Sequence, residues 1–93
     1  MNVQMGETIS KREVKAYSAT TVDGKAVVNG QVAYDKDDKV VDCNGRISDE
    51  NGNQIANFNV FGSGESLQVN MTDCDVDVVA EAAAIAKGTL EAL

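Results

Sequence analysis

The sequence predicts an α+β fold, a five-stranded antiparallel β-meander with one C-terminal α-helix packed across one face of the sheet. Three observations predict it. Runs of alternating apolar and polar residues fill most of the first seventy positions, and a two-residue period is typical of half-buried strands. Short turns rich in Asp, Asn and Gly separate these runs. After Val76 the apolar period becomes that of a helix.

The composition is that of one small folded domain without a nucleic-acid or membrane partner. The chain has 93 residues, is 43% hydrophobic and carries a net charge of −7, so residues 1–93 are expected to form a single domain. Residues 42–93 hold nine acids and two bases, and such an acidic half repels phosphates and anionic lipid surfaces. No secretory or membrane-spanning pattern is seen. We therefore expect a cytoplasmic protein with reduced cysteines.

Turn residues divide the first part of the chain into five expected strands. The turn signals are Asp23-Gly24, Asp35-Lys36-Asp37-Asp38, Asp49-Glu50-Asn51-Gly52 and Gly62-Ser63-Gly64. They place strands near residues 9–22, 25–34, 39–48, 54–61 and 66–72. The connections are too short for parallel crossovers, so the pairing is predicted to be antiparallel. Asn29-Gly30 and Asn44-Gly45 could be hairpin turns themselves, but positions within strands are favoured because a turn at Asn29 would leave a strand of only four residues.

Alternation assigns an apolar and a polar face to this sheet. The apolar face, expected to form the core, carries Ala26, Val28, Gly30, Val32, Tyr34, Val41, Cys43, Gly45, Ile47, Ala56, Phe58, Val60, Leu67, Val69 and Met71. The polar face carries mainly amides, with Val27, Val40, Ile55 and Phe61 near its strand ends. One register places all apolar sets on the same side.

The helix is expected over about residues 75–92, with Thr72 or Asp75 as its N-cap. The alternating aspartates of Asp73-Cys74-Asp75-Val76-Asp77 are interpreted as the acidic start of this helix, because their spacing splays the carboxylates around a turn. The middle of the apolar helix face consists of Ala82, Ala83 and Ala86. We expect these small residues to lie opposite Gly30 and Gly45, allowing the helix to approach the sheet closely.

Neither a catalytic nor a metal-binding constellation is predicted. The chain has no histidine, which excludes imidazole catalysis and histidine metal sites. Counted from Asp35 or from Asp49, the acidic turns do not match the ligand spacing of an EF-hand. Cys43 and Cys74 are too few for a zinc site. Cys43 is expected to be an inert buried thiol, and whether it pairs with Cys74 stays open. The chain is therefore predicted not to be an enzyme and to need no cofactor.

The polar face is the surface with the most functional content, because amides recur on four expected neighbouring strands. Amide groups bind peptide backbones and other polar groups without needing charge. The candidate interaction residues are Asn29, Gln31, Asn44, Asn57, Asn59, Gln68 and Asn70. The sequence thus favours a non-enzymatic module that binds another protein or a second copy of itself, through this face or a sheet edge. The alternative is a domain that binds a small ligand or a calcium-type ion with its acidic turn loops.

Overall fold

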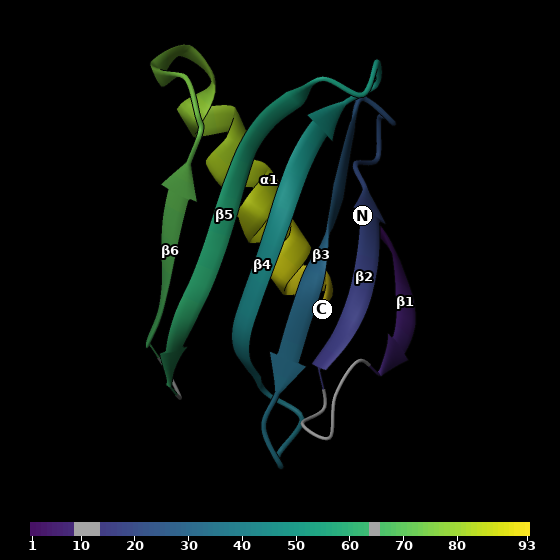
Figure 1. Cartoon of the computed structure of the whole chain (residues 1–93), viewed down its shortest axis with the longest axis vertical. Coiled ribbons are helices and arrows are strands. Elements are labelled where there is room, and N and C mark those ends of the chain that lie inside the picture. The colour runs from purple at the N-terminus through teal and green to yellow at the C-terminus, as the bar shows by residue number, and fades with distance from the viewer. Residues whose placement is uncertain (9–13, 64–65) are drawn as a thin grey trace.

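The computed structural model describes residues 1–8, 14–63 and 66–93 and shows an α+β fold with a six-stranded antiparallel sheet and one C-terminal helix. The strands lie in the order β1-β2-β3-β4-β5-β6, so each pairs with its neighbours in sequence. They are β1 (Asn2–Thr8), β2 (Val14–Thr20), β3 (Ala26–Tyr34), β4 (Val40–Asp49), β5 (Gln54–Ser63) and β6 (Ser66–Thr72). A 3-10 turn, η1 (Val76–Val78), leads into the helix α1 (Val79–Ala92), which crosses one face of the sheet (Figure 1). We call this covered face the inner face and the opposite one the outer face.

The prediction of five strands is wrong by one, because an additional strand, β1, precedes the first expected strand, whose residues 9–22 contain β2. In the β1–β2 pair Val3 lies opposite Ala19 and Met5 lies opposite Tyr17. β1 contains only these two apolar inward residues, Val3 and Met5, which is too short an alternation to signal a strand. Residues 9–13, where the expected strand begins, and Gly64 of the fourth predicted turn lie outside the described residues.

The predicted acidic turns are hairpin turns, and two of them share one hydrogen-bond pattern. In residues 35–39 and in residues 49–53, the first amide donates to the fifth carbonyl and the fourth amide donates to the first carbonyl, at 2.8–3.0 Å. The fourth residue of each turn has a positive φ, 60° at Asp38 and 83° at Gly52. These turns join β3 to β4 and β4 to β5, so they set the register of the sheet's centre.

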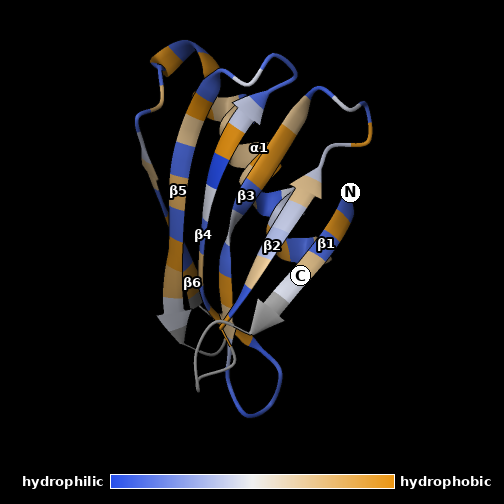
Figure 2. Ribbon diagram, turned by 45° about the vertical axis from the view of Figure 1, so that its right-hand side comes forward, coloured by the Kyte–Doolittle hydropathy of each residue, from blue (hydrophilic) through white to orange (hydrophobic). Residues whose placement is uncertain are grey.

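The predicted apolar face is the inner face, and its central residues form the core. Hydrophilic and hydrophobic residues alternate along the strands in Figure 2. The buried hydrophobic residues are Tyr17, Ala19, Ala26, Val28, Val32, Cys43, Ile47, Ala56, Phe58, Val60, Ala82, Ile85 and Ala86. The predicted core residues Leu67 and Val69 of β6 are exceptions, with exposed fractions of 39% and 46%. The course of α1 behind the central strands leaves this part of β6 uncovered (Figure 1).

Two β-bulges change which aliphatic residues reach the core. At the bulge between β3 and β4, Val40 lies opposite Tyr34 and packs against the core. Val41, predicted to be a core residue, instead lines a hollow. At the bulge between β4 and β5, Ile55 is the additional residue and also packs against the core. A bulge inserts one residue into one strand and shifts the alternation beyond it, so the predicted faces of these three residues are wrong.

Gly30 and Gly45 lie within β3 and β4, directly opposite each other, so their assignment to strands is confirmed. The predicted reason for them, close approach of the helix, is wrong. A Cβ built on Gly45 would lie 2.5 Å and 2.6 Å from carbons of the Phe58 ring and 2.7 Å from the Tyr17 hydroxyl. A Cβ built on Gly30 would collide with the main-chain oxygen of Asn44. Aromatic side chains of the neighbouring strands fill the space above Gly45, and the main chain of β4 fills it at Gly30.

The helix packs through a face that differs slightly from the predicted one. Its buried residues are Ala82, Ile85, Ala86 and Thr89, whereas Ala83 is exposed. Thr89 joins the buried face because its hydroxyl donates a hydrogen bond to the carbonyl of Ile85 at 2.9 Å, which satisfies the polar group within the helix. No helix in the described part of the chain is both long and apolar enough to cross a membrane.

The start of the helix also differs from the prediction. Thr72 is the last residue of β6 and therefore not an N-cap. Asp75 holds the N-cap position of η1, but its side chain makes no capping hydrogen bond. Asp73 adopts a positive φ of 52°, and its carboxylate accepts a hydrogen bond from the Asn57 side chain at 3.2 Å. The acidic segment is thus a connection that is tied back to β5.

Candidate functional site on the outer face

The seven predicted interaction residues lie on the outer face, and six of them form two rows that run across the strands. Strand register places Asn29, Arg46 and Asn57 opposite one another on β3, β4 and β5. The next row consists of Gln31, Asn44, Asn59 and Asn70 on β3, β4, β5 and β6. Gln68 lies beyond this row, opposite Phe61. Six of the seven residues are exposed, and Asn57, which is bonded to the Asp73 carboxylate, is half-buried.

We call the four side chains Gln31, Asn44, Asn59 and Asn70 the amide row. Directly opposite residues of an antiparallel pair have Cβ atoms about 4.5–5.5 Å apart, so the row is a continuous strip of amides across four strands. Amides offer both donors and acceptors and carry no charge. Such a strip can bind a polar, uncharged surface such as a peptide backbone.

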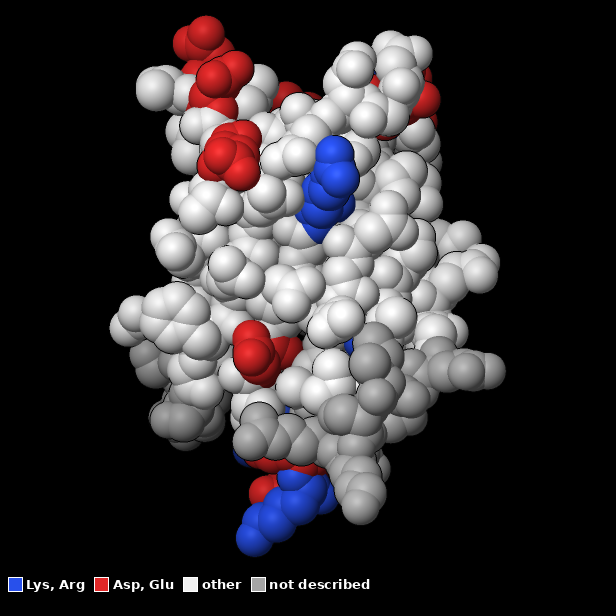
Figure 3. All heavy atoms as spheres, viewed as in Figure 1, with Lys and Arg blue, Asp and Glu red and all other residues white. Residues whose placement is uncertain are grey.

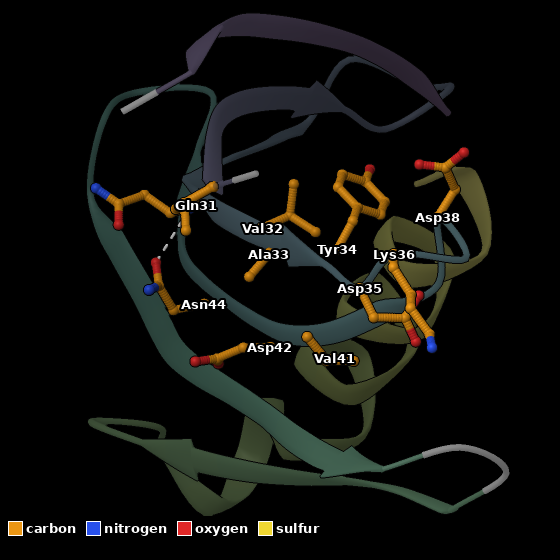
Figure 4. Close-up of a pocket in the computed structure, with 11 residues that line it drawn as sticks. Gln31, Val32, Ala33, Tyr34, Asp35, Lys36, Asp38, Val41, Asp42 and Asn44 are labelled. Carbon is orange, nitrogen blue, oxygen red and sulfur yellow. Dashed lines mark hydrogen bonds between the residues drawn. The ribbon is translucent and has the colours of Figure 1, made fainter. Parts of the chain in front are cut away.

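Asn44 is the one member of the amide row with a defined structural role. Its side-chain oxygen accepts a hydrogen bond from the main-chain amide of Gln31 at 3.2 Å (Figure 4). Its main-chain oxygen accepts a hydrogen bond from the buried Tyr17 hydroxyl at 2.7 Å. That oxygen therefore lies on the inner side of the sheet, where a side chain at Gly30 would otherwise project. The glycine pair and Tyr17 thus fix the position of Asn44 from the inner side of the sheet.

The outer face carries little charge, although a quarter of the chain's residues (25%) are charged. Among the described outward-facing residues of β3 to β6, only Asp42 and Arg46 are ionic. In Figure 3 the acidic groups gather mainly at the two ends of the molecule, and most of the face between them is uncharged. Phe61 adds an apolar group that is 50% exposed. Depletion of charge distinguishes the centre of protein interfaces from ordinary surface.

A hollow of about 600 Å³ opens beside one end of the amide row. Its lining includes Gln31, Ala33, Val41, Asp42 and Asn44, together with the turn that joins β3 to β4 (Figure 4). Sequence reasoning does not find this hollow, because it depends on the bulge that turns Val41 out of the core. The lining is mixed, because the apolar side chains of Ala33 and Val41 lie beside charged residues of the β3–β4 turn and Asp42.

One carboxylate in each turn accepts hydrogen bonds from the turn itself. We call Asp23, Asp35 and Asp49 the turn aspartates. The Asp35 carboxylate accepts hydrogen bonds from the amides of Lys39 and Asp37 at 3.0 Å and 2.8 Å. The Asp49 carboxylate accepts hydrogen bonds from the amides two and four residues ahead, both at 2.9 Å.

These hydrogen bonds stabilise the ionised form of each turn aspartate. The amide of Lys39 holds the pKa of Asp35 below its usual value, and the amide of Asn53 does the same for the pKa of Asp49. The Thr21 hydroxyl lowers the pKa of Asp23. Among residues 1–8, 14–63 and 66–93, no group of three or more His, Cys, Asp or Glu side chains is placed to hold a metal ion.

The two cysteines are free, and Cys43 is buried beneath the sheet. Its thiol lies 3.6 Å from the Tyr17 hydroxyl. Burial raises the pKa of the Cys43 thiol and also raises the pKa of Tyr17, so both groups stay protonated near neutral pH. A protonated, enclosed thiol is a poor nucleophile. Cys43 therefore acts as a packing residue, and Cys74 is partly exposed at the start of the helical segment.

Comparison with known protein families, with curated proteins and with solved structures finds no match to this chain.

Proposed function

We propose that this chain is a non-enzymatic protein-interaction module and that its outer face binds a protein partner. The observation that carries the proposal is the amide row, an exposed and nearly uncharged strip on an otherwise acidic molecule. A sheet face that serves only solubility in a chain with this much charge would be expected to carry more ionic side chains. Amides, Phe61 and the adjacent hollow supply hydrogen bonding, apolar contact and shape on one surface.

Two observations make the alternative functions less suitable. A calcium-binding loop needs free carboxylate oxygens that converge on one ion, whereas the turn aspartates accept hydrogen bonds from their own turns. A carboxyl that acts as a general acid needs a raised pKa, whereas the pKa values of the turn aspartates are lowered. The first observation argues against ion binding by these turns, and the second argues against acid catalysis by the turn aspartates.

The outer face can be tested with one substitution and a matched control. Asn59 is exposed at the centre of the amide row, and Asn51 is exposed in the turn between β4 and β5. Asn59→Arg and Asn51→Arg therefore make the same chemical change on and off the face. Affinity capture from cell lysate would use the unmodified chain and both variants as baits, with mass spectrometry of the bound proteins. Each specific protein would then be purified and its Kd measured by calorimetry.

The expected result is a partner that binds the unmodified chain and Asn51→Arg but binds Asn59→Arg at least tenfold more weakly, because one buried unpaired charge costs more than about 1.4 kcal/mol. Equal binding to all three baits would refute a role for the outer face. A parallel titration with Ca²⁺ tests the alternative function. Heat of binding together with a raised Tm would favour the ion-binding domain, and no response is expected.

A further inference from the structure

Within the described residues β6 forms one edge of the sheet, and its sequence is complementary to itself. We propose that this chain also binds a second copy of itself, joined edge to edge with the β6 strands antiparallel across a twofold axis at Val69. This inference goes beyond the proposed function, because the second copy binds at the β6 edge and not on the outer face. The resulting sheet would continue through both copies, with both helices on the same side.

The two edges of the sheet differ in how well they are protected against pairing. An exposed edge presents unpaired amides and carbonyls, and natural proteins protect such edges with bulges, charged residues or proline. The β1 edge contains a bulge between Met5 and Thr8. β6 pairs with β5 in an unbroken register, and its sequence SLQVNMT has neither a charge nor a proline. The β6 edge is therefore the one open to pairing.

Outward from Val69, the sequence of β6 reads alike in both directions. Gln68 matches Asn70, and Leu67 matches Met71. A twofold axis at Val69 pairs this strand with its own copy so that Val69 faces Val69, Gln68 faces Asn70 and Leu67 faces Met71. In antiparallel strands directly opposite residues lie on the same face. Amides thus meet amides on the outer face, and apolar side chains meet apolar side chains on the inner face. Isologous contacts of this kind are the commonest form of homodimer.

The distribution of charge also favours association of two copies at the β6 edge. Two copies with a net charge of −7 each repel one another, so they are expected to meet where charge is lowest. Residues 54–72, which include β5 and β6, contain a single charged residue, Glu65. The strands that would form the centre of the joined sheet are therefore the least repelled part of the molecule.

The pairing would also cover apolar surface that α1 leaves exposed. Leu67 and Val69 face the inner side of β6 with exposed fractions of 39% and 46%. In the twofold arrangement each packs against the equivalent strand of the other copy. On the outer face, Asn70 at the end of the amide row would lie beside Gln68 of the second copy, so the two amide rows become neighbours. The contact is small compared with interfaces of about 1,200–2,000 Å², and a reversible dimer is expected.

The two edges offer a matched pair of variants. Val69 in β6 and Met5 in β1 face the inner side of their strands, and both are 46% exposed. Val69→Lys would place two like charges opposite each other in the dimer, which opposes pairing. It also lowers the net negative charge, so any loss of association cannot come from general repulsion. Met5→Lys makes the same charge change at the other edge.

Sedimentation equilibrium over a micromolar to millimolar concentration series tests the proposal. The weight-average mass of the unmodified chain and of Met5→Lys is expected to rise from 9.8 kDa toward twice that value, while Val69→Lys stays at the monomer mass. Hydrogen exchange of the unmodified chain supplies a second readout that does not depend on the folding of a variant. Protection of the amides of Leu67 to Met71 is expected to increase with concentration, with no change in β1.

A monomer at every concentration would overturn the proposal, as would equal association of Val69→Lys and the unmodified chain. Assemblies larger than two copies would overturn the closed twofold arrangement. A monomeric chain that still captures a partner through Asn59 would overturn this inference and leave the proposed function standing. A dimer through β6, with no captured protein whose binding depends on Asn59, would support this inference and overturn the proposed role of the outer face.

Discussion

The glycine pair beneath the amide row leads to a specific stability prediction for Gly45→Ala. The added methyl group would lie 2.5–2.7 Å from the Phe58 ring and the Tyr17 hydroxyl, whereas carbon atoms in good contact are about 3.5–4.0 Å apart. The ring must therefore retreat by about 1 Å within a packed core. Overpacking of this size costs about 1–3 kcal/mol, and loss of the hydrogen bond from Tyr17 to Asn44 adds about 1 kcal/mol. The expected loss is about 2–4 kcal/mol in the free energy of unfolding.

The cause can be separated from a general intolerance of alanine. Phe58→Leu removes the ring that the new methyl group meets, so Gly45→Ala should cost about 1 kcal/mol less in that background, as a double-mutant cycle measures. Gly30→Ala serves as the control, because its added carbon meets the main chain of Asn44, which Phe58→Leu does not relieve. Urea unfolding followed by circular dichroism gives all values. Equal cost of Gly45→Ala in both backgrounds would refute the proposed contact.

Three further predictions concern single groups. Tyr17→Phe should lower the free energy of unfolding by about 1–2 kcal/mol, because the main-chain oxygen of Asn44 loses its donor; urea unfolding with an unchanged m-value checks this, and no loss would contradict it. Gly52→Ala should lower the free energy of unfolding by about 1 kcal/mol, because the residue has a positive φ, whereas Asp38→Gly should raise it by about 0.5 kcal/mol at the equivalent position. Thermal unfolding should therefore show a lower Tm for Gly52→Ala and a higher Tm for Asp38→Gly, and a shift in the same direction would contradict this. The turn aspartates have lowered pKa values, so their contribution is complete above the unfolded pKa of about 3.9 and is lost as the pH falls through the folded values. Urea midpoints should therefore decrease below about pH 4, and less so when these aspartates are replaced by Asn.

The central part of the fold could be predicted because its signals are local. Turn residues and two-residue alternation are enough to place β3 to β6, their antiparallel pairing and the helix. β1 could not be found, since two inward residues, Val3 and Met5, do not make a readable period. The bulges that exchange Val40 for Val41 depend on how one strand fits its neighbour, and alternation within a single strand does not contain that information.

The candidate site, too, could be predicted only where local alternation determines it. Which residues share the outer face follows from alternation, so the sequence alone is enough to place Asn59 and Asn70 together. The special position of Asn44 could not be predicted, because it requires the register of three strands at once. Its main-chain oxygen is reached by Tyr17 from β2 across Gly30 of β3. Likewise, the neighbours of Gly45 are set by rotamers of aromatic side chains on other strands.

The sequential order of the strands has a consequence for how the chain folds. Neighbouring strands in the sheet are also neighbours in sequence. Each new strand can therefore pair with the one before it at a low loop-closure entropy. The contact between α1 and Met1, which precedes β1, is different, because the Thr89 hydroxyl lies 3.3 Å from the Met1 sulfur across 88 positions of sequence. We expect this closure to come last, with φ-values near zero for substitutions at Thr89 and higher ones in β3 and β4. The packing of the helix would then lower the unfolding rate more than it raises the folding rate.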